Sequence, residues 1–285
     1  AAVANGVPGT SGSSLEQAME LDAATKSFTG GMAPTRGNSL FDHNHALSLG
    51  NQTKLFGRPL GYVASLSYNN SYDYYSNGVT GRYRLTDNVN NVSNLNKEIL
   101  VRDQAGSRSV LWGGLFNLSY MPAPKQKISV NYIRNQSGTS GARTQEGQLA
   151  RDDKDLYYQT NRIDYTLRSL DAIQLKGDHV LDGLKGLHID YIGSVTFSSQ
   201  NEPDLRFFTY DYTLLNGDTL YDIQPNLYDP PSRYFRKMTE QNTDLKVNVE
   251  LPIVLSETRT MKIKVGGAMT NKNRQFTENR YEYDY

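Results

Sequence analysis

Apolar and polar side chains alternate along two stretches of the chain that a proline-rich turn connects. From position 110 to position 120, Trp112 and Phe116 fall on one side of an extended chain, and Asn117 and Ser119 fall on the other. The turn that follows carries two prolines and two lysines, and the alternation restarts at position 128. Because successive side chains of a strand point to opposite faces, this pattern predicts a β-hairpin with one apolar and one polar face.

The same pattern recurs in three further hairpins, so the chain predicts an all-β fold of about eight antiparallel strands. Tight turns are expected near Arg58, Ala123, Leu184 and Thr258. The predicted strands are 40–56, 60–75, 108–120, 128–135, 163–181, 187–198, 245–251 and 261–270. Long polar loops are predicted at 77–108, 136–160 and 199–233. Residues 1–38 are rich in small and polar residues and predict a loop before the first strand, with a short helix at 14–25 as the alternative.

Whether lipid or protein covers the apolar face decides between a transmembrane barrel and a soluble β-protein. The mean hydropathy is -0.61, and no run of about 18 apolar residues occurs, which argues against a transmembrane helix. A transmembrane barrel keeps a low mean hydropathy, because its strands alternate and its loops are polar. Outer-membrane barrels also alternate short periplasmic turns with long external loops, as this chain does. We therefore predict that residues 39–285 form part of a transmembrane β-barrel in a bacterial outer membrane.

The polar and aromatic side chains fit the same prediction. Charged residues on the polar faces of the strands are expected to line the lumen, and they are Lys54, Asp190, Lys246, Glu250 and Lys264. Tyrosines fall where an aromatic girdle is expected at the membrane surface, at positions 68, 72, 74, 120, 132 and 191. A soluble β-sandwich is the alternative, but it predicts shorter strands and turn signals every 8 to 12 residues or so.

The order of short and long connections carries a further expectation. If the short turns are periplasmic, the first predicted strand enters the membrane from outside and the eighth returns to the outside. Complete barrels of this class begin and end in the periplasm. The chain, which opens without a signal peptide, is therefore expected to be an internal piece of a larger barrel.

Several segments resemble the barrel of TonB-dependent receptors of Bacteroidetes. The first, Phe28–Tyr75, includes Met32-Ala33-Pro34-Thr35 before the first predicted strand and Leu55-Phe56-Gly57-Arg58-Pro59-Leu60-Gly61 at its turn. The others are Asp164–Leu170 with Gln174–His179, and Asn201–Phe208. The resemblance covers most of the chain from Phe28, and none of its motifs is a catalytic signature.

The resemblance implies a barrel of about 22 strands that encloses an N-terminal plug and takes up a scarce ligand. The implied partners are outer-membrane lipid, the plug and the remaining barrel strands, a TonB-type energy-coupling protein and a surface lipoprotein. The plug and the segment that contacts TonB are not among these 285 residues. Two alternatives stay open: the barrel of another outer-membrane pore or secretion complex, and a soluble or surface β-protein that binds glycans.

Composition and motifs exclude several other functions. Lys and Arg number 30 against 30 Asp and Glu, so no nucleic-acid partner is expected, and the absence of cysteine removes thiolate chemistry. No nucleophile elbow, phosphate loop, paired-carboxylate site or HExxH occurs, so we expect no enzyme and assign no catalytic, cofactor-binding or metal residues and no cofactor.

Weaker candidates for a site remain in the loops and at the strand ends. His43 and His45 share one strand face, which could suit a metal, but they, His179 and His188 are better explained as residues of the barrel rim or the lipid interface. The acidic run Asp152, Asp153 and Asp155 is weighed as a solvated segment against a calcium site. Aromatic residues in the predicted loops could contact a ligand or pack on one another, and they are Tyr157, Tyr158, Phe207, Phe208 and Tyr210.

Overall fold

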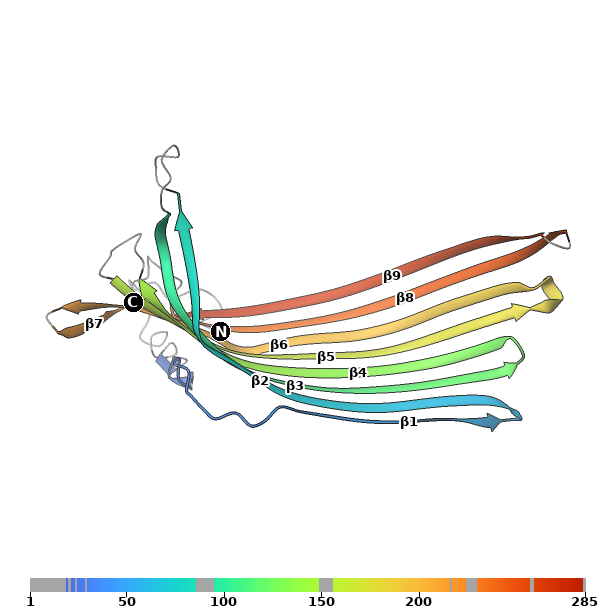
Figure 1. The fold of residues 1–285 in the computed structure, drawn as a ribbon, viewed down its shortest axis with the longest axis horizontal. Coiled ribbons are helices and arrows are strands. Elements are labelled where there is room, and N and C mark those ends of the chain that lie inside the picture. Colours follow the sequence, from blue (N-terminus) through green and yellow to red (C-terminus); the bar gives the residue numbers. More distant parts are fainter. Residues whose placement is uncertain are drawn as a thin grey trace.

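The chain forms one open antiparallel sheet of nine strands in the computed structural model (Figure 1). The strand order is β1-β2-β3-β4-β5-β6-β8-β9, and β7 pairs with β6 outside this path. The strands are β1 His43–Leu55, β2 Arg58–Arg84, β3 Asn96–Ala123, β4 Gln126–Gln148, β5 Leu156–Leu181, β6 Leu187–Leu215, β7 Asp218–Asp222, β8 Ser232–Ser256 and β9 Arg259–Glu282. The structure describes residues 19, 22–23, 25–28, 30–85, 95–148, 156–215, 217–223, 230–256 and 259–283.

The prediction of antiparallel hairpins is confirmed for all four pairs of long strands. The β1–β2 turn lies one or two residues earlier than predicted, because Phe56 and Gly57 form it with φ angles of 50° and 75°, and Arg58 already belongs to β2. Two central residues with positive φ match the twist of a two-residue hairpin. The β5–β6 turn contains the 3-10 helix η1, Asp182–Leu184.

The strands are longer than the alternating pattern predicted, and this corrects the predicted loops. Most of 77–108, 136–160 and 199–233 is strand, because β2 continues to Arg84 and β6 to Leu215. Ladder pairing uses main-chain hydrogen bonds, which need no apolar side chain. The alternation of apolar and polar residues therefore ends where the apolar face of a strand becomes polar. The main-chain hydrogen bonding between strands continues beyond that point.

The short strand β7 was missed within the predicted loop 199–233. It pairs with the outer end of β6, and Asp222 lies opposite Asp211. The sequence does carry a signal for this hairpin, because Asn-Gly stands at 216–217 between two short apolar runs.

The long strands bend near their outer ends, which are the ends away from the short turns. The register of β2 and β3 shifts between Tyr75 and Gly78, and a bulge of this kind bends a strand and increases its twist. Figure 1 shows the β2–β3 end turning away from its neighbours, while the β6–β7 end continues outward. The outer ends are thereby separated into distinct surfaces.

Few side chains are buried in the described part of the chain. The buried hydrophobic residues are Val101, Tyr158, Leu205 and Tyr234, all at the outer ends of the strands. Along the rest of the sheet, Phe116 is 43% exposed and Leu66 is 62% exposed. The described residues thus form a single layer, and no second sheet packs on the apolar side.

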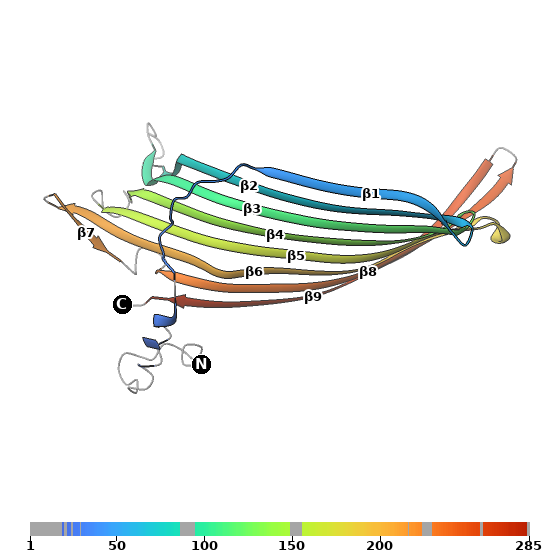
Figure 2. The same ribbon diagram turned by 90° about the horizontal axis from the view of Figure 1, so that it is seen from below.

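The segment before β1 crosses the outer ends of the strands. Figure 2 shows it running from beside the C-terminal end of β9 to the start of β1. Residues 22, 23 and 25–27 within it are helical, so part of the alternative short helix is present. Residues 28 and 30–42 are called the strap below.

Candidate functional site

The two faces of the sheet differ in chemistry as the alternation predicted. In the strand register, Leu49, Ala64, Phe116, Tyr132 and Ile173 lie side by side on one face. Rows on both sides of this one add further exposed apolar side chains, which include Leu47, Leu66, Val130, Leu175, Leu245, Val265 and Met269. These residues form a continuous apolar band over the eight long strands.

The apolar band crosses the strands obliquely. On β2 it covers Leu60–Tyr68, whereas on β8 it covers Leu245–Ile253, which lies closer to the short turns in the strand register. The register row of Tyr68 and Trp112 reaches Thr239 on β8, which is already polar. The band therefore shifts toward the turns by six residues over the five steps from β2 to β8. This shift corresponds to a strand tilt of about 40° at ordinary β-sheet spacings.

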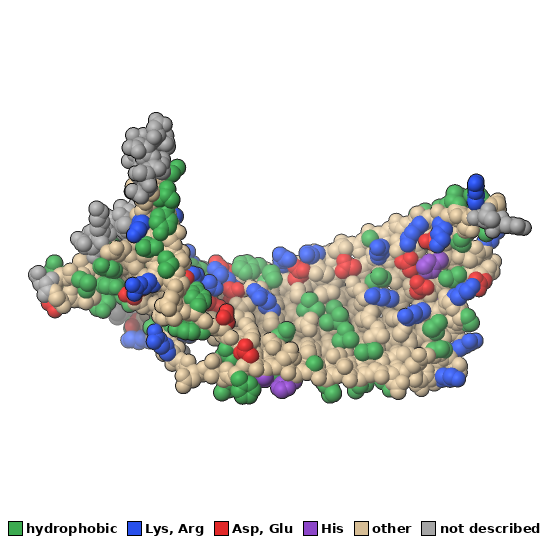
Figure 3. Space-filling view, in the orientation of Figure 1, with side chains coloured by type: hydrophobic (Ala, Val, Ile, Leu, Met, Phe, Trp, Pro, Cys, Tyr) green, Lys and Arg blue, Asp and Glu red, His purple; other side chains and the backbone are tan. Residues whose placement is uncertain are grey.

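The opposite face is polar and hydrogen-bonded. Ser119 and Ser129 lie 2.9 Å apart, and the Asn131 side-chain amide donates to Gln174 over 3.3 Å. The five residues predicted to line a lumen all lie on this face by register. Three of them make ion pairs there: Glu250 with Lys262 at 2.8 Å, and Asp190 with Lys264 at 3.9 Å. Figure 3 shows one broad face of the sheet with basic and acidic side chains interspersed along the strands.

The structure brings together part of the predicted aromatic set at the outer ends of β5, β6 and β7. Tyr157 stacks on Tyr212 with ring centroids 5.4 Å apart, and Tyr210 lies 5.8 Å from both Phe208 and Tyr221. Sequence reasoning missed Tyr212 and Tyr221, because the Asn-Gly at 216–217, which is the local signal for the β6–β7 hairpin, was left inside the predicted loop 199–233. Burial raises the pKa of Tyr212, and its hydrogen bond to Glu146 acts in the same direction.

Tyr158 and Phe207 lie outside this aromatic cluster. Tyr158 is buried on the opposite face beside Val101, where burial raises its pKa. Phe207 packs edge-on against Tyr234 with centroids 5.9 Å apart. Of the five aromatic residues predicted to contact a ligand or pack on one another, only Tyr157, Phe208 and Tyr210 lie in the cluster. Their rings contact other aromatic rings, as the packing alternative predicted.

An ionic cluster that the sequence did not reveal holds the strap against the sheet. Asp204, at the bulge of β6, accepts hydrogen bonds from Arg206 at 2.6 Å and from Arg233 at 2.8 Å. Arg206 also donates to the Gly31 carbonyl over 2.7 Å. Burial alone would raise the pKa of the Asp204 carboxyl, but the hydrogen bonds from Arg233 and Arg206 lower it overall.

Phe28 anchors the strap next to this ionic cluster. Its ring lies 5.1 Å from that of Tyr281 and 6.3 Å from that of Phe235, and the Arg233 guanidinium lies 4.8 Å from the ring centroid. Aromatic and cation–π contacts of this kind each contribute about 0.5–1.5 kcal/mol.

We expect Phe28→Ala to weaken docking of the strap by about 1–3 kcal/mol, because it removes all three of these contacts. Limited trypsin digestion measures the effect as lost protection of the strap from cleavage after Arg36. Phe41→Ala is the matched control, because Phe41 is 79% exposed. Equal protection in both variants would show that Phe28 does not hold the strap.

Asp211 is buried without a hydrogen-bond partner among the described residues. It is 1% exposed, and neither carboxylate oxygen makes a hydrogen bond there. Burial raises the pKa of Asp211 to about 6, and the charge of Asp222 opposite it adds to the effect.

This buried carboxylate predicts a pH dependence. A folded-state pKa raised above the unfolded value of about 3.9 means that the native state binds the proton more tightly, so stability falls as the pH rises through about 4 to 6. Asp211→Asn should therefore stabilise the β6–β7 hairpin by about 1–3 kcal/mol at pH 8 and have little effect near pH 4. Hydrogen exchange of the β7 amides, corrected for the intrinsic rate, checks this. Destabilisation at both pH values would contradict it.

A second ion pair, with a buried carboxylate and a half-exposed guanidinium, lies at the outer end of β3. Arg143 forms a bidentate pair with Asp103, whose side chain is 5% exposed, and Thr80 also donates to Asp103 over 3.3 Å. The hydrogen bonds from Arg143 lower the pKa of the Asp103 carboxyl despite its burial. The pair connects three strands at the point where the β2–β3 end bends.

The histidines do not assemble into a metal centre in the described part of the chain. His43 and His45 do share a face, with ring centroids 5.4 Å apart, and His43 stacks on Tyr68. His179 hydrogen-bonds to Gln126 at 2.6 Å, and His188 pairs with Asp178 at 3.1 Å. No group of three or more His, Cys, Asp or Glu among the described residues could hold a metal ion. The acidic run at 152, 153 and 155 lies outside the described residues.

Comparison with family models and curated sequences adds no relative. No model of a known protein family and no curated protein sequence matches this chain. Within the described residues, no helix combines the length and the apolar character that crossing a membrane requires.

Proposed function

We propose that this chain forms part of the barrel wall of a TonB-dependent transporter that takes up a scarce ligand across a bacterial outer membrane. The observation that carries the proposal is the continuous apolar band on one exposed face of a single-layer sheet, opposite a hydrogen-bonded polar face. Exposed apolar patches of this extent mark surfaces that another apolar phase covers. Hydrocarbon tails are that phase for long antiparallel strands with one polar face.

The course of the band supports lipid over a second protein layer. Strands of closed barrels tilt by about 35–45° from the barrel axis, so a level lipid band must cross them obliquely. The shift of six residues over the five steps from β2 to β8 gives a tilt in this range. Tyrosines also lie at both boundaries of the band: Tyr68 and Tyr132 near the outer boundary, and Tyr120 near the short turns. The predicted girdle residue Tyr191 lies within the band, opposite Val247.

The two edge strands of the sheet, β1 and β9, support a larger barrel. Among the described strands, β1 pairs only with β2, and β9 pairs only with β8. Unpaired main-chain groups are not tolerated in hydrocarbon, so a lipid-embedded sheet needs further strands that close it. In the proposed transporter these are the remaining barrel strands, and the polar face holds the plug.

Energised uptake rests on the resemblance to TonB-dependent receptors. It would use a TonB-type energy-coupling protein, and a surface lipoprotein is a candidate partner at the outer ends. The polar face offers the plug hydrogen-bonding groups, as in the Asn131–Gln174 and Asn248–Asp190 contacts.

Membrane flotation and a permeability assay test the proposal together. We expect the whole proposed transporter, with its plug and remaining barrel strands, to float with lipid vesicles after a carbonate wash and to need detergent for solubility. It should leave the vesicles closed to small sugars, because the plug fills the lumen. Vesicles that leak sugars would favour an open pore instead. Monodisperse protein in plain buffer would overturn the membrane assignment and favour the soluble β-protein.

A further inference from the structure

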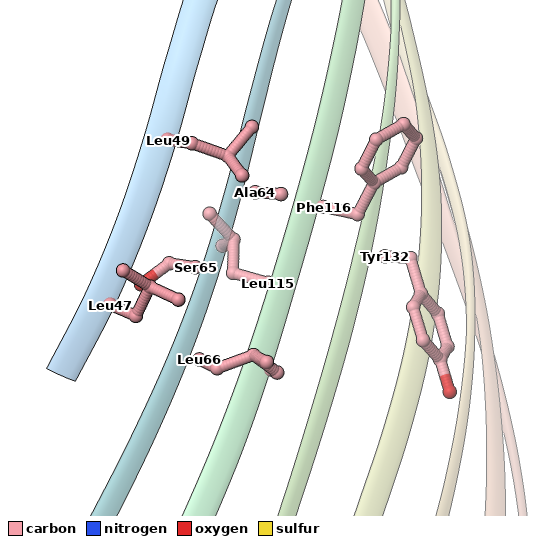
Figure 4. Close-up of a pocket in the computed structure, with 9 residues that line it drawn as sticks. Leu47, Leu49, Ala64, Ser65, Leu66, Leu115, Phe116 and Tyr132 are labelled. Atoms are coloured by element: carbon pink, nitrogen blue, oxygen red, sulfur yellow. The ribbon is translucent and has the colours of Figure 1, made fainter. Parts of the chain in front are cut away.

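A shallow groove interrupts the apolar band near its outer boundary. It is lined by Leu47, Leu49, Ala64, Leu66, Phe116 and Tyr132 and has a volume of about 320 Å³. Figure 4 shows the two leucines of β1 along one flank and the Tyr132 ring along the other, with Ala64 between them. The groove exists because small residues, Ala64 and Gly114, lie between larger neighbours on the same face.

An ion pair lies at one end of this groove. Arg134 is the direct cross-strand neighbour of the groove residue Gly114, and its Nη1 donates to Asp171 Oδ1 over 3.2 Å. The Tyr132 hydroxyl donates to the same oxygen over 2.9 Å, and the guanidinium lies 5.5 Å from the Trp112 ring. The pair is thus built from residues of three neighbouring strands at the boundary of the apolar band.

The ion pair keeps unused hydrogen-bonding capacity. Both recorded bonds to Asp171 end on Oδ1, so its Oδ2 accepts no hydrogen bond within the described part of the chain. Arg134 uses only Nη1, and its side chain is 43% exposed, against 31% for Asp171. A planar guanidinium is well suited to a phosphate, and a carboxylate oxygen is well suited to an ammonium.

We propose that this site binds one phospholipid whose headgroup carries both a phosphate and an ammonium. The phosphate takes the free N–H groups of Arg134, the ammonium donates to Asp171 Oδ2, and one acyl chain occupies the groove. The adjacent opposite charges favour such a headgroup over a purely anionic one, which Asp171 would repel. The inference rests on the proposed membrane location, because a lipid reaches this face only if the band lies in a bilayer.

Native mass spectrometry of the detergent-purified protein tests the inference. The protein is incubated with phosphatidylethanolamine, phosphatidylglycerol or diacylglycerol of the same acyl chains, and retained lipid is counted. We expect phosphatidylethanolamine to be retained most strongly. Arg134→Gln should lower its retention about tenfold, because one charge-assisted contact is lost. Asp171→Asn should remove the preference over phosphatidylglycerol.

Two further variants separate the groove from the headgroup site. Ala64→Phe fills the groove and should lower the retention of all three lipids, whereas Lys176→Gln, on the polar face of β5, should change none. Each variant is first shown to float with vesicles. If Arg134→Gln and Asp171→Asn float but retain phosphatidylethanolamine as the unmodified protein does, the lipid site is wrong and the membrane proposal stands. If the unmodified protein does not float, both fail.

Discussion

Replacing Val249 with arginine is expected to lower the free energy of unfolding of the membrane-inserted protein by about 2–4 kcal/mol. Val249 lies in the middle of the apolar band on β8, directly between Ile189 of β6 and Val265 of β9. A guanidinium at this position would have to enter hydrocarbon or distort the bilayer, and this cost is greatest at the bilayer midplane of a barrel. A urea titration in lipid vesicles, monitored by tryptophan fluorescence, measures the change.

The adjacent residue provides the control for this experiment. Asn248 lies on the same strand but on the polar face, where its amide donates to Asp190 at 2.5 Å. Asn248→Arg places the same side chain beside a carboxylate in a wet environment, and we expect a change within about 1 kcal/mol. Val130→Arg repeats the test on β4 with the same expectation as Val249→Arg. Equal effects of Val249→Arg and Asn248→Arg would contradict lipid contact on the apolar face.

Features that repeat with a period of two residues could be predicted from the sequence. The division between Asn117 on one face and Phe116 on the other follows from strand geometry alone, and the register confirms it. Three of the short turns were equally accessible, because proline or glycine marks them locally. The turn predicted near Thr258 contains neither residue type, and positions 257 and 258 lie outside the described residues. The outer strand ends were not, since β2 continues to Arg84 through residues without a buried face.

Contacts between distant segments could not be predicted. The strap depends on Phe28 meeting Tyr281, which is more than 250 positions away in the chain, and no local pattern connects the two. The lipid site proposed on the apolar face has the same character, because Arg134 and Asp171 become neighbours only through the pairing of β4 with β5. In both cases the side chains are ordinary, and the strand register creates the cluster.

Asp204→Asn is the second substitution with a large expected effect. Asp204 accepts hydrogen bonds from two guanidinium groups, and the Arg233 side chain is only 5% exposed, so the substitution removes a carboxylate charge that lies directly against a buried cation. Breaking a buried pair in this way costs about 3–5 kcal/mol, and the lower value applies here because the Asp204 side chain keeps 21% exposure. We also expect residues 30–42 of the strap to lose protection from cleavage, since Arg206 donates hydrogen bonds to both the Asp204 carboxylate and the Gly31 carbonyl.

The pH dependence of this variant distinguishes the loss of charge from general disruption. The Asp204 pKa is lowered in the folded state, so its stabilising contribution is present above about pH 4 and is lost as the pH falls through the folded-state pKa. The difference between Asp204→Asn and the unmodified protein should therefore be largest at neutral pH and shrink in acid. Asp182→Asn is the control, because its pair with Lys125 is exposed on both sides and contributes at most about 1 kcal/mol. A cost for Asp204→Asn that stays constant from pH 7 to about pH 3 would show that the carboxylate acts through its shape and not its charge.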